Sequence, residues 1–243
     1  MSGHSKWHNI QGRKGKADKA KSGQFTRASR MITVATREGG ADPETNFSLR
    51  LAITKAKEVN MPKDTIERAI KKGSGELKDG EQLETLLYEG FGPGGVAILI
   101  DVLTDNRNRS ASDIKHMVSK LGGTLGAPGS VQWQFEKRAV IRITAEVKQQ
   151  VASWDSAELA FMDAGVLDIQ ESQEGVVLLA EQHDFARVVH AAEKLNIPLS
   201  ESGIEWLPKD TLTIDDASRA ALDTFMDTLY DMDDVNTVYT NAE

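Results

Sequence analysis

The spacing of apolar residues changes near Gly73, and this change constrains the fold more than any other feature of the chain. Before Gly73, apolar residues recur every three or four positions, which is typical of amphipathic helices. After it, short apolar runs such as Val96–Ile100 lie between glycine-rich turns and helical patterns. The sequence therefore predicts a helical N-terminal region followed by an α/β body.

Three helices are expected in the N-terminal region. The first ends near Arg37, before two glycines, and the second begins at Asp42-Pro43-Glu44, because Asp can cap a helix and Pro tolerates its first turn. Asn60-Met61-Pro62 ends the second helix, and the third runs from Pro62 to Lys72. The positions expected to face the core are Phe25, Ala28, Ile32, Ala35, Leu49, Ala52, Ile53, Ala56, Val59, Ile66, Ala69 and Ile70.

The body contains two patterns of strands and helices. Residues 83–135 predict, in order, two strands, a helix and a strand over 83–91, 96–103, 112–121 and 131–135. Residues 139–201 predict the order β-α-β-β-α-β over 139–144, 146–164, 166–171, 175–180, 184–195 and 197–201. The end of the chain predicts a helix over 216–231 and a strand over 235–239.

The first pattern lacks a second helix and a fourth strand, and residues 203–241 contain one of each. We therefore predict an α+β fold of three domains: a small helical N-terminal domain and two α/β sandwich-like (ferredoxin-like) domains, one inserted in the other. The expected boundaries are 1–78 for the helical domain, 79–136 with 203–243 for the discontinuous α/β domain, and 137–202 for the inserted domain.

Charge is distributed unevenly along the chain. Residues 1–72 contain 16 Lys and Arg and 7 Asp and Glu, a net charge of +9, whereas residues 73–243 have a net charge of −17. A basic segment on an acidic body indicates a polyanionic partner that contacts one end of the protein, because the body repels it.

Cations are densest between Lys6 and Lys21, where Asp18 is the only acidic residue. Lys and Arg side chains release counterions from a phosphate backbone, and an exposed Trp can stack on an unpaired base. The alternative is a solvated tail with a buried Trp. The candidate nucleic-acid contacts in this segment are Lys6, Trp7, Arg13, Lys14, Lys16, Lys19 and Lys21.

A second candidate lies between an expected strand and an expected helix, in the sequence Thr104-Asp105-Asn106-Arg107-Asn108-Arg109. Arg107 and Arg109, with backbone N–H groups at the start of helix 112–121, could hold a phosphate. A capped turn with solvated arginines would have the same sequence.

Other motifs do not predict a cofactor, a metal or a catalytic site. Gly90–Gly95 matches the pattern GxGxxG, but the strand that follows predicts a hairpin loop instead of a dinucleotide site. His4 and His8 lack further metal ligands nearby, and the acidic run Asp231, Asp233 and Asp234 is more typical of a polar helix end than of a metal site. We expect a protein that is not an enzyme.

The chain contains no cysteine, which excludes disulfides, thiolate zinc sites and cysteine nucleophiles. No apolar run approaches the ~20 residues of a membrane helix, and the N-terminus has no apolar core of a secretory signal. These features lead us to expect a cytoplasmic protein with no membrane contact.

Several segments together resemble the YebC-type family of probable transcriptional regulators, which includes the mitochondrial translational activator of cytochrome oxidase. They include residues 3–7, Arg13-Lys14, Phe25-Thr26-Arg27, 60–76, 88–95, 104–109, 122–135 and the closing 233–239. The resemblance implies a helical N-terminal domain and two α/β domains, with DNA binding in some relatives and ribosome association in others. It also implies that Arg27, Arg107 and Arg109 contact nucleic acid together with the N-terminal cations.

The combined hypothesis is a nucleic-acid-binding regulator of gene expression, most simply a DNA-binding transcriptional regulator. The alternative is a ribosome-associated translation factor that binds ribosomal RNA, since Lys and Arg contact both phosphate backbones. In either case the acidic α/β domains are available to the ribosome or the transcription machinery. A protein adaptor that binds no nucleic acid, and a metal-dependent hydrolase that uses the acidic run, are the remaining alternatives.

Overall fold

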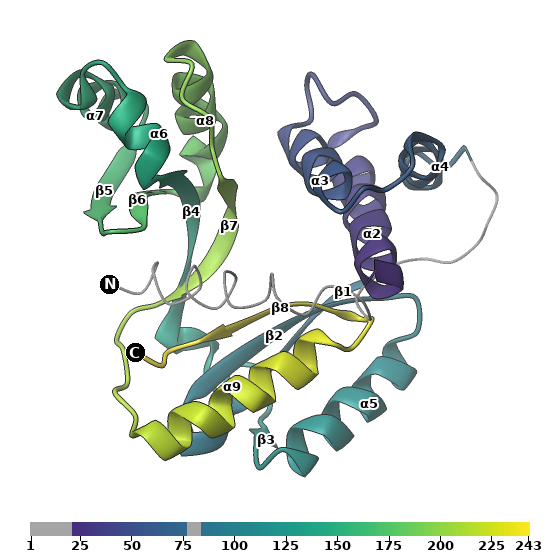
Figure 1. Ribbon diagram of the computed structural model, residues 1–243. Coiled ribbons are helices and arrows are strands. Elements are labelled where there is room, and N and C mark those ends of the chain that lie inside the picture. The colour runs from purple at the N-terminus through teal and green to yellow at the C-terminus, as the bar shows by residue number, and fades with distance from the viewer. Residues whose placement is uncertain (1–20, 77–83) are drawn as a thin grey trace. The chain divides into compact units, whose positions relative to one another are not determined.

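The computed structural model describes residues 21–76 and 84–243, and it confirms a mixed α+β fold with a helical N-terminal region and two antiparallel sheets (Figure 1). These residues form two compact units. One contains residues 135–211, and the other contains residues 21–76, 84–134 and 212–243. The predicted domain boundaries stay predictions.

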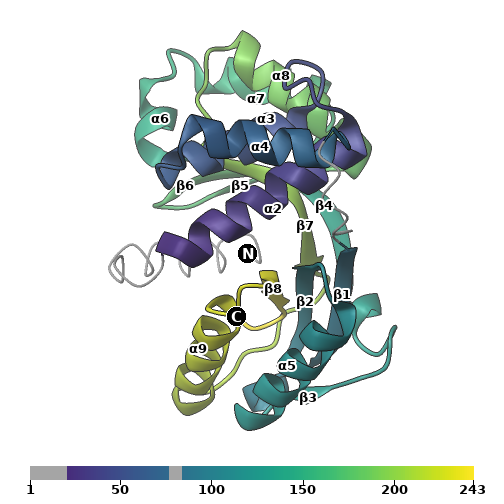
Figure 2. The same ribbon diagram turned by 90° about the vertical axis from the view of Figure 1, so that its right-hand side faces the viewer.

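The helical region consists of α2 (Lys21–Gly39), α3 (Phe47–Glu58) and α4 (Lys63–Gly73), with α2 packed against the other two (Figure 2). The apolar positions predicted to face its core are confirmed. Its buried residues are Ala28, Ile32, Ala35, Leu49, Ala52, Ala56, Met61, Ile66 and Ala69. Gly73 permits close packing of α4 on α2, because a Cβ there would lie 2.5 Å from the carbonyl oxygen of Thr33.

The predicted start of the second helix at residues 42–44 is wrong, because those residues form a turn. Asp42 accepts hydrogen bonds from the backbone of Glu44 and Asn46, and the helix begins at Phe47. Buried Asn46 is the N-cap and accepts from the N–H of Leu49 at 3.0 Å. Its Nδ2 donates to the carbonyls of Ala35 and Gly40, both at 2.7 Å, so one side chain joins α2 to α3.

The first sheet has the strand order β3-β1-β2-β8, and all its pairs are antiparallel. Its strands are β1 (Glu84–Phe91), β2 (Ala97–Thr104), β3 (Thr124–Leu125) and β8 (Val235–Thr240). Helices α5 (Arg107–Lys120) and α9 (Asp216–Tyr230) lie side by side against it (Figure 1). The end of the chain therefore contributes α9 and β8 to a sheet that begins with β1 and β2.

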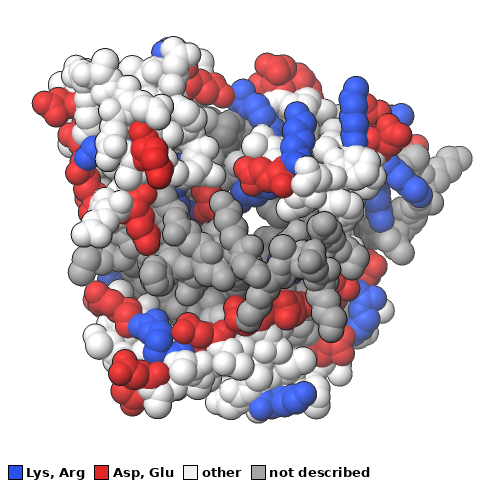
Figure 3. Space-filling model, viewed as in Figure 1, with Lys and Arg blue, Asp and Glu red and all other residues white. Residues whose placement is uncertain are grey.

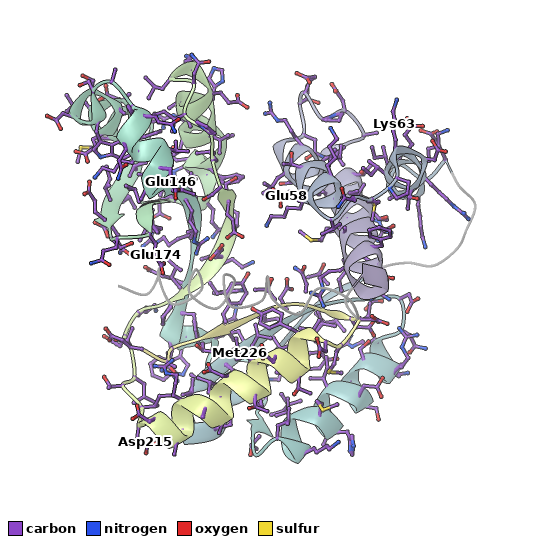
Figure 4. All side chains as sticks on the ribbon, in the orientation of Figure 1. Glu58, Lys63, Glu146, Glu174, Asp215 and Met226 are labelled. Atoms are coloured by element: carbon purple, nitrogen blue, oxygen red, sulfur yellow. The ribbon has the colours of Figure 1, made fainter. Side chains whose placement is uncertain are left out.

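One core joins these distant segments. Ile98 and Ile100 of β2 pack with Ile114 of α5 and with Phe225 and Leu229 of α9. Asp215 caps α9 by accepting from the N–H of Ser218 at 2.7 Å, and Met226 lies on the buried side of the same helix (Figure 4).

Two boundaries predicted in this part of the chain are wrong. The helix expected over 112–121 begins earlier, at Arg107, because Asn106 caps it and its polar first turn carries no apolar pattern. Residues 131–135 are not a strand. Gln132–Gln134 form a 3-10 turn, because the carboxylate of Glu89 binds the N–H groups of Val131 and Gln132. The short strand β3 was not predicted.

The second sheet has the order β5-β6-β4-β7, also fully antiparallel. Its strands are β4 (Phe135–Thr144), β5 (Val166–Glu171), β6 (Gly175–Ala180) and β7 (Glu201–Pro208). Its helices are α6 (Ala145–Gln150), α7 (Trp154–Asp163) and α8 (Phe185–Lys194). The element order β-α-β-β-α-β and this strand order are those of a ferredoxin-like sheet, as predicted.

Two predictions in this unit need correction. The helix expected over 146–164 is broken at residues 151–153, where Ser153 caps α7. The last strand lies over Glu201–Pro208 and not over 197–201, because it is residues 201–208 that pair with β4.

A buried ion pair lies within the second sheet. Arg142 of β4 has no exposed surface, and it donates to both carboxylate oxygens of Glu205 at 2.7 and 3.0 Å. The Oε2 of Glu201 lies 3.7 Å from the Nη1 of Arg142. In the part of the chain that the structure describes, no helix is long and apolar enough to cross a membrane.

Candidate nucleic-acid interface

The structure places four of the ten predicted nucleic-acid contacts. Lys6, Trp7, Arg13, Lys14, Lys16 and Lys19 lie outside the described residues. Lys21 is the first residue of α2 and Arg27 lies one turn and a half further on, whereas Arg107 and Arg109 lie in the first turn of α5.

Arg27 and Arg30 of α2 bind the turn between α9 and β8. The Nη2 of Arg27 donates to the carbonyl of Tyr230. The Nη1 of Arg30 donates to the carbonyls of Leu103 and Asp233, at 3.2 and 3.0 Å, and to the carboxylate of Asp234 at 2.6 Å. Both arginines therefore have partners within the protein, and they hold α2 against the first sheet.

Asp234 is the centre of this polar cluster. Its carboxylate accepts from Ser110 at 2.6 Å and from Arg109 at 3.2 Å, in addition to Arg30. Burial by itself would raise the pKa of Asp234, but the hydrogen bonds from Ser110, Arg30 and Arg109 lower this pKa below its ordinary value. The carboxylate therefore stays charged and forms ion pairs with both arginines.

The two arginines in the first turn of α5 differ in their contacts. The guanidinium of Arg109 binds Asp234 and lies 2.8 Å from Asp105, and these two carboxylates raise its pKa. Its backbone N–H is bound by the cap residue Asn106 at 3.1 Å. Arg107 is exposed, and no described carboxylate lies within ion-pair distance of it. Of this pair, Arg107 is the residue available to a phosphate.

Sequence reasoning missed three cations on the outer surface of α3 and α4. Lys57, Arg68 and Lys71 are exposed and form no ion pair with any described residue. Figure 3 shows Lys and Arg side chains over this region, together with a smaller number of acidic ones. Because Arg68 and Lys71 lie opposite the buried positions Ile66 and Ala69, the helical spacing could have identified them.

Lys63 begins α4 and projects from the surface (Figure 4), where it lies 3.6 Å from Glu67. Lys63 is therefore paired with a carboxylate, unlike the exposed Arg68 and Lys71 of the same helix.

A second buried carboxylate shapes a loop after the first sheet. Glu89 accepts hydrogen bonds from the N–H groups of Gly129, Val131 and Gln132 at 2.5, 2.9 and 2.8 Å. Burial alone would raise the pKa of Glu89, and the three backbone donors lower it below its ordinary value. Trp133, which follows this loop, is 67% exposed.

Among residues 21–76 and 84–243, no group of three or more His, Asp or Glu side chains is arranged to hold a metal ion. Asp234, one of the acidic run considered above, instead binds arginines.

Two family models together match nearly the whole chain. The TACO1/YebC protein N-terminal domain matches residues 5–76, and the TACO1/YebC second and third domain matches residues 83–242. The chain belongs to the TACO1/YebC family. The resemblance seen in the sequence motifs is therefore confirmed.

Relatives of similar length share this family membership. A probable transcriptional regulatory protein of Natranaerobius thermophilus is 43% identical and covers 100% of this chain and 96% of its own. A probable transcriptional regulatory protein of Clostridium acetobutylicum is 44% identical, and the match covers 100% of this chain and 97% of the relative. A crystal structure of a conserved hypothetical protein from Aquifex aeolicus is 39% identical, with a TM-score of 0.80 over 93% of this chain and 91% of that one.

Proposed function

We propose that this TACO1/YebC-family protein is a non-catalytic, cytoplasmic regulator of gene expression that binds nucleic acid through its basic helical region. The relatives named above as probable transcriptional regulatory proteins support the regulatory role. The acidic unit 135–211 is then free to contact a protein partner in the transcription machinery or the ribosome.

The separation of charge supports this proposal most directly. Lys57, Arg68 and Lys71 of α3 and α4 are exposed, and none of them has a described carboxylate within ion-pair distance. By contrast, Arg30 and Arg109, which lie next to the first sheet, both form ion pairs with Asp234. Unpaired outward cations on one region are what a phosphate backbone requires.

Duplex DNA and ribosomal RNA share this phosphate chemistry, and we favour DNA as the ligand because of the names of the relatives. Ribosomal RNA is the alternative. The roles of Lys6, Trp7, Arg13, Lys14, Lys16, Lys19 and Lys21 belong to the same proposal.

The test measures binding of the full chain to duplex DNA and to ribosomal RNA over a series of salt concentrations. We expect the logarithm of affinity to fall with the logarithm of salt, with a slope of about −0.9 per phosphate contact for duplex DNA. Deleting residues 1–24 should remove most of the binding. The double substitution Arg68→Glu with Lys71→Glu should make the salt slope shallower by the amount that about two phosphate contacts contribute.

A matched control reverses two exposed cations of the acidic unit, Lys194→Glu with Lys209→Glu. This variant should bind as the unchanged protein does. Binding that is absent, or that responds equally to both pairs of substitutions, would refute the proposal and favour an adaptor role.

A further inference from the structure

Trp133 is the most exposed large apolar side chain among the described residues, with 67% of its surface open to water. It lies in the 3-10 turn Gln132–Gln134, directly before β4. Trp is enriched at binding surfaces, because its ring offers a large apolar area while its N–H keeps a hydrogen-bond partner.

The backbone of the loop that holds Trp133 is bound by one buried carboxylate. The carboxylate of Glu89 is almost fully buried and accepts hydrogen bonds from three N–H groups of this one loop, those of Gly129, Val131 and Gln132. Gly129 has a φ of +85°, a conformation that favours glycine. Burying a carboxylate is costly unless it is hydrogen-bonded, so the three N–H groups and Glu89 stabilise one another only in this loop conformation.

The indole ring itself is oriented by a hydrogen bond. Its Nε1 donates to the carbonyl of Ser130 at 3.1 Å. The one polar atom of the ring is therefore satisfied, and the rest of the ring offers an apolar surface that needs no polar partner. A ring fixed in this way loses little conformational freedom when a flat ligand stacks on it.

The surroundings favour a nucleobase over a protein surface. Residues 121–135 contain no charged side chain, so a polyanion meets less repulsion at this loop than on the rest of the acidic body. On β1, the strand that pairs with β3 before this loop, Phe91 is the one large apolar side chain that is exposed, at 41%. Protein interfaces bury aromatic anchors in the middle of larger apolar clusters, whereas one base needs one ring face.

We propose that Trp133 is a stacking site for an unpaired nucleobase, which would make a single-stranded or flipped-out segment of nucleic acid part of the ligand. This proposal rests on the proposed function and specifies it: the cations bind phosphates, and Trp133 binds a base that is not in a duplex. In a continuous duplex the bases are stacked on each other, and Trp133 would have no base to contact.

The experiment compares binding of the full chain to a fluorescently labelled, unstructured single-stranded RNA and to the duplex of the same sequence, over a salt series. Trp133→Ala should weaken single-strand binding by roughly 5- to 150-fold. The salt slope should not change, because no phosphate contact is lost. Duplex binding should also stay unchanged, and Trp133→Phe should keep part of the single-strand affinity.

Leu159→Ala is the control, because Leu159 is exposed to a similar degree, at 65%, in the other unit. It should leave both affinities unchanged, and thermal unfolding should show that both variants remain folded. If Trp133→Ala binds the single strand as the unchanged protein does, or weakens single-strand and duplex binding equally, the stacking site is refuted while the cationic interface stands. If the unchanged protein binds neither ligand, both proposals fail.

Discussion

The helical segment 21–76 and the unit 135–211 both contain paired and exposed cations, but the second has an ion pair buried within its sheet. In the unit 135–211, Arg138, Arg142, Lys148 and Arg187 all form ion pairs with carboxylates of the same unit. In the helical segment, Lys57, Arg68 and Lys71 are exposed without such a partner among the described residues.

The difference shows where each region obtains its stability. The helical segment has an apolar core made largely of alanine, isoleucine and leucine, and its central buried polar link is the uncharged Asn46. The unit 135–211 includes a charged pair within its sheet. The exposed Lys57, Arg68 and Lys71 are available to a ligand, and they support the helical segment as the candidate interface.

The largest effect is expected at the buried pair of the second sheet. Arg142→Ala leaves the carboxylate of Glu205 buried without its guanidinium, which should cost about 3–5 kcal/mol of the free energy of unfolding. Urea unfolding measures the loss, and hydrogen exchange locates it in β4 and β7. Lys209→Ala, at an exposed position, is the control. A loss below about 1 kcal/mol would mean that the pair contributes little.

The largest polar effect in the helical segment should come from an uncharged residue. Asn46→Ala removes the cap of α3 and both hydrogen bonds to the end of α2, which should cost about 1–3 kcal/mol. Ser48→Ala, at an exposed position in the first turn of α3, is the matched control. If hydrogen exchange in α2 and α3 is the same in both variants, Asn46 does not link the helices.

Acid should weaken the attachment of α2 to the first sheet. The pKa of Asp234 lies below its ordinary value of 3.8 in the folded protein, so its contribution to stability is present above pH 3.8 and is lost as pH falls through the folded pKa. Asp234→Asn should therefore lower stability at neutral pH and reduce its dependence on pH in the acid range. Thermal unfolding at several pH values measures both effects. If stability falls in acid by the same amount in Asp234→Asn as in the unchanged protein, other carboxylates determine its acid dependence.

The smallest effect is expected at an exposed pair on α4. Lys63→Ala removes the ion pair with Glu67, whose two side chains are mostly in water, and should change stability by about 0.2–0.5 kcal/mol or less. Added salt should remove even this difference. A loss as large as that of Asn46→Ala would contradict the view that the surface charges of this segment are dispensable for folding.

Local sequence patterns predicted most of the elements and one core in detail. The apolar spacing of residues 25–70 gave the buried face of each N-terminal helix, because an amphipathic helix repeats its buried side every three or four residues. The pattern over 139–201 gave the ferredoxin-like order, although it missed the break before Ser153 and placed the last strand several residues early.

Two of the errors occurred where contacts with another segment determine the local conformation. Residues 131–135 have a strand-like alternation, but Glu89, about forty positions earlier, binds their N–H groups and forms a turn. The start of the second helix was misplaced because Asn46 was not recognised as the residue that binds the carbonyls of α2. Short-range propensity does not include such contacts.

The candidate interface was predicted only in part. Charge along the sequence indicated a basic N-terminal region, and motif similarity suggested Arg27 and Arg109. The structure shows that Arg27 donates to Tyr230 and that Arg109 binds Asp234, whereas Arg107 remains exposed.

The sequence by itself determined the family, the class of the fold and the separation of basic from acidic regions, because composition, motifs and apolar spacing are properties of the chain alone. Only the tertiary structure decided which charged side chains are neutralised. Asp234 reaches Arg30, Arg109 and Ser110 from more than 120 residues away, and folding alone brings these groups within hydrogen-bonding distance. The exposure of Trp133 was likewise visible only in the tertiary structure, because Trp133 lies in a loop whose backbone is bound by the carboxylate of Glu89.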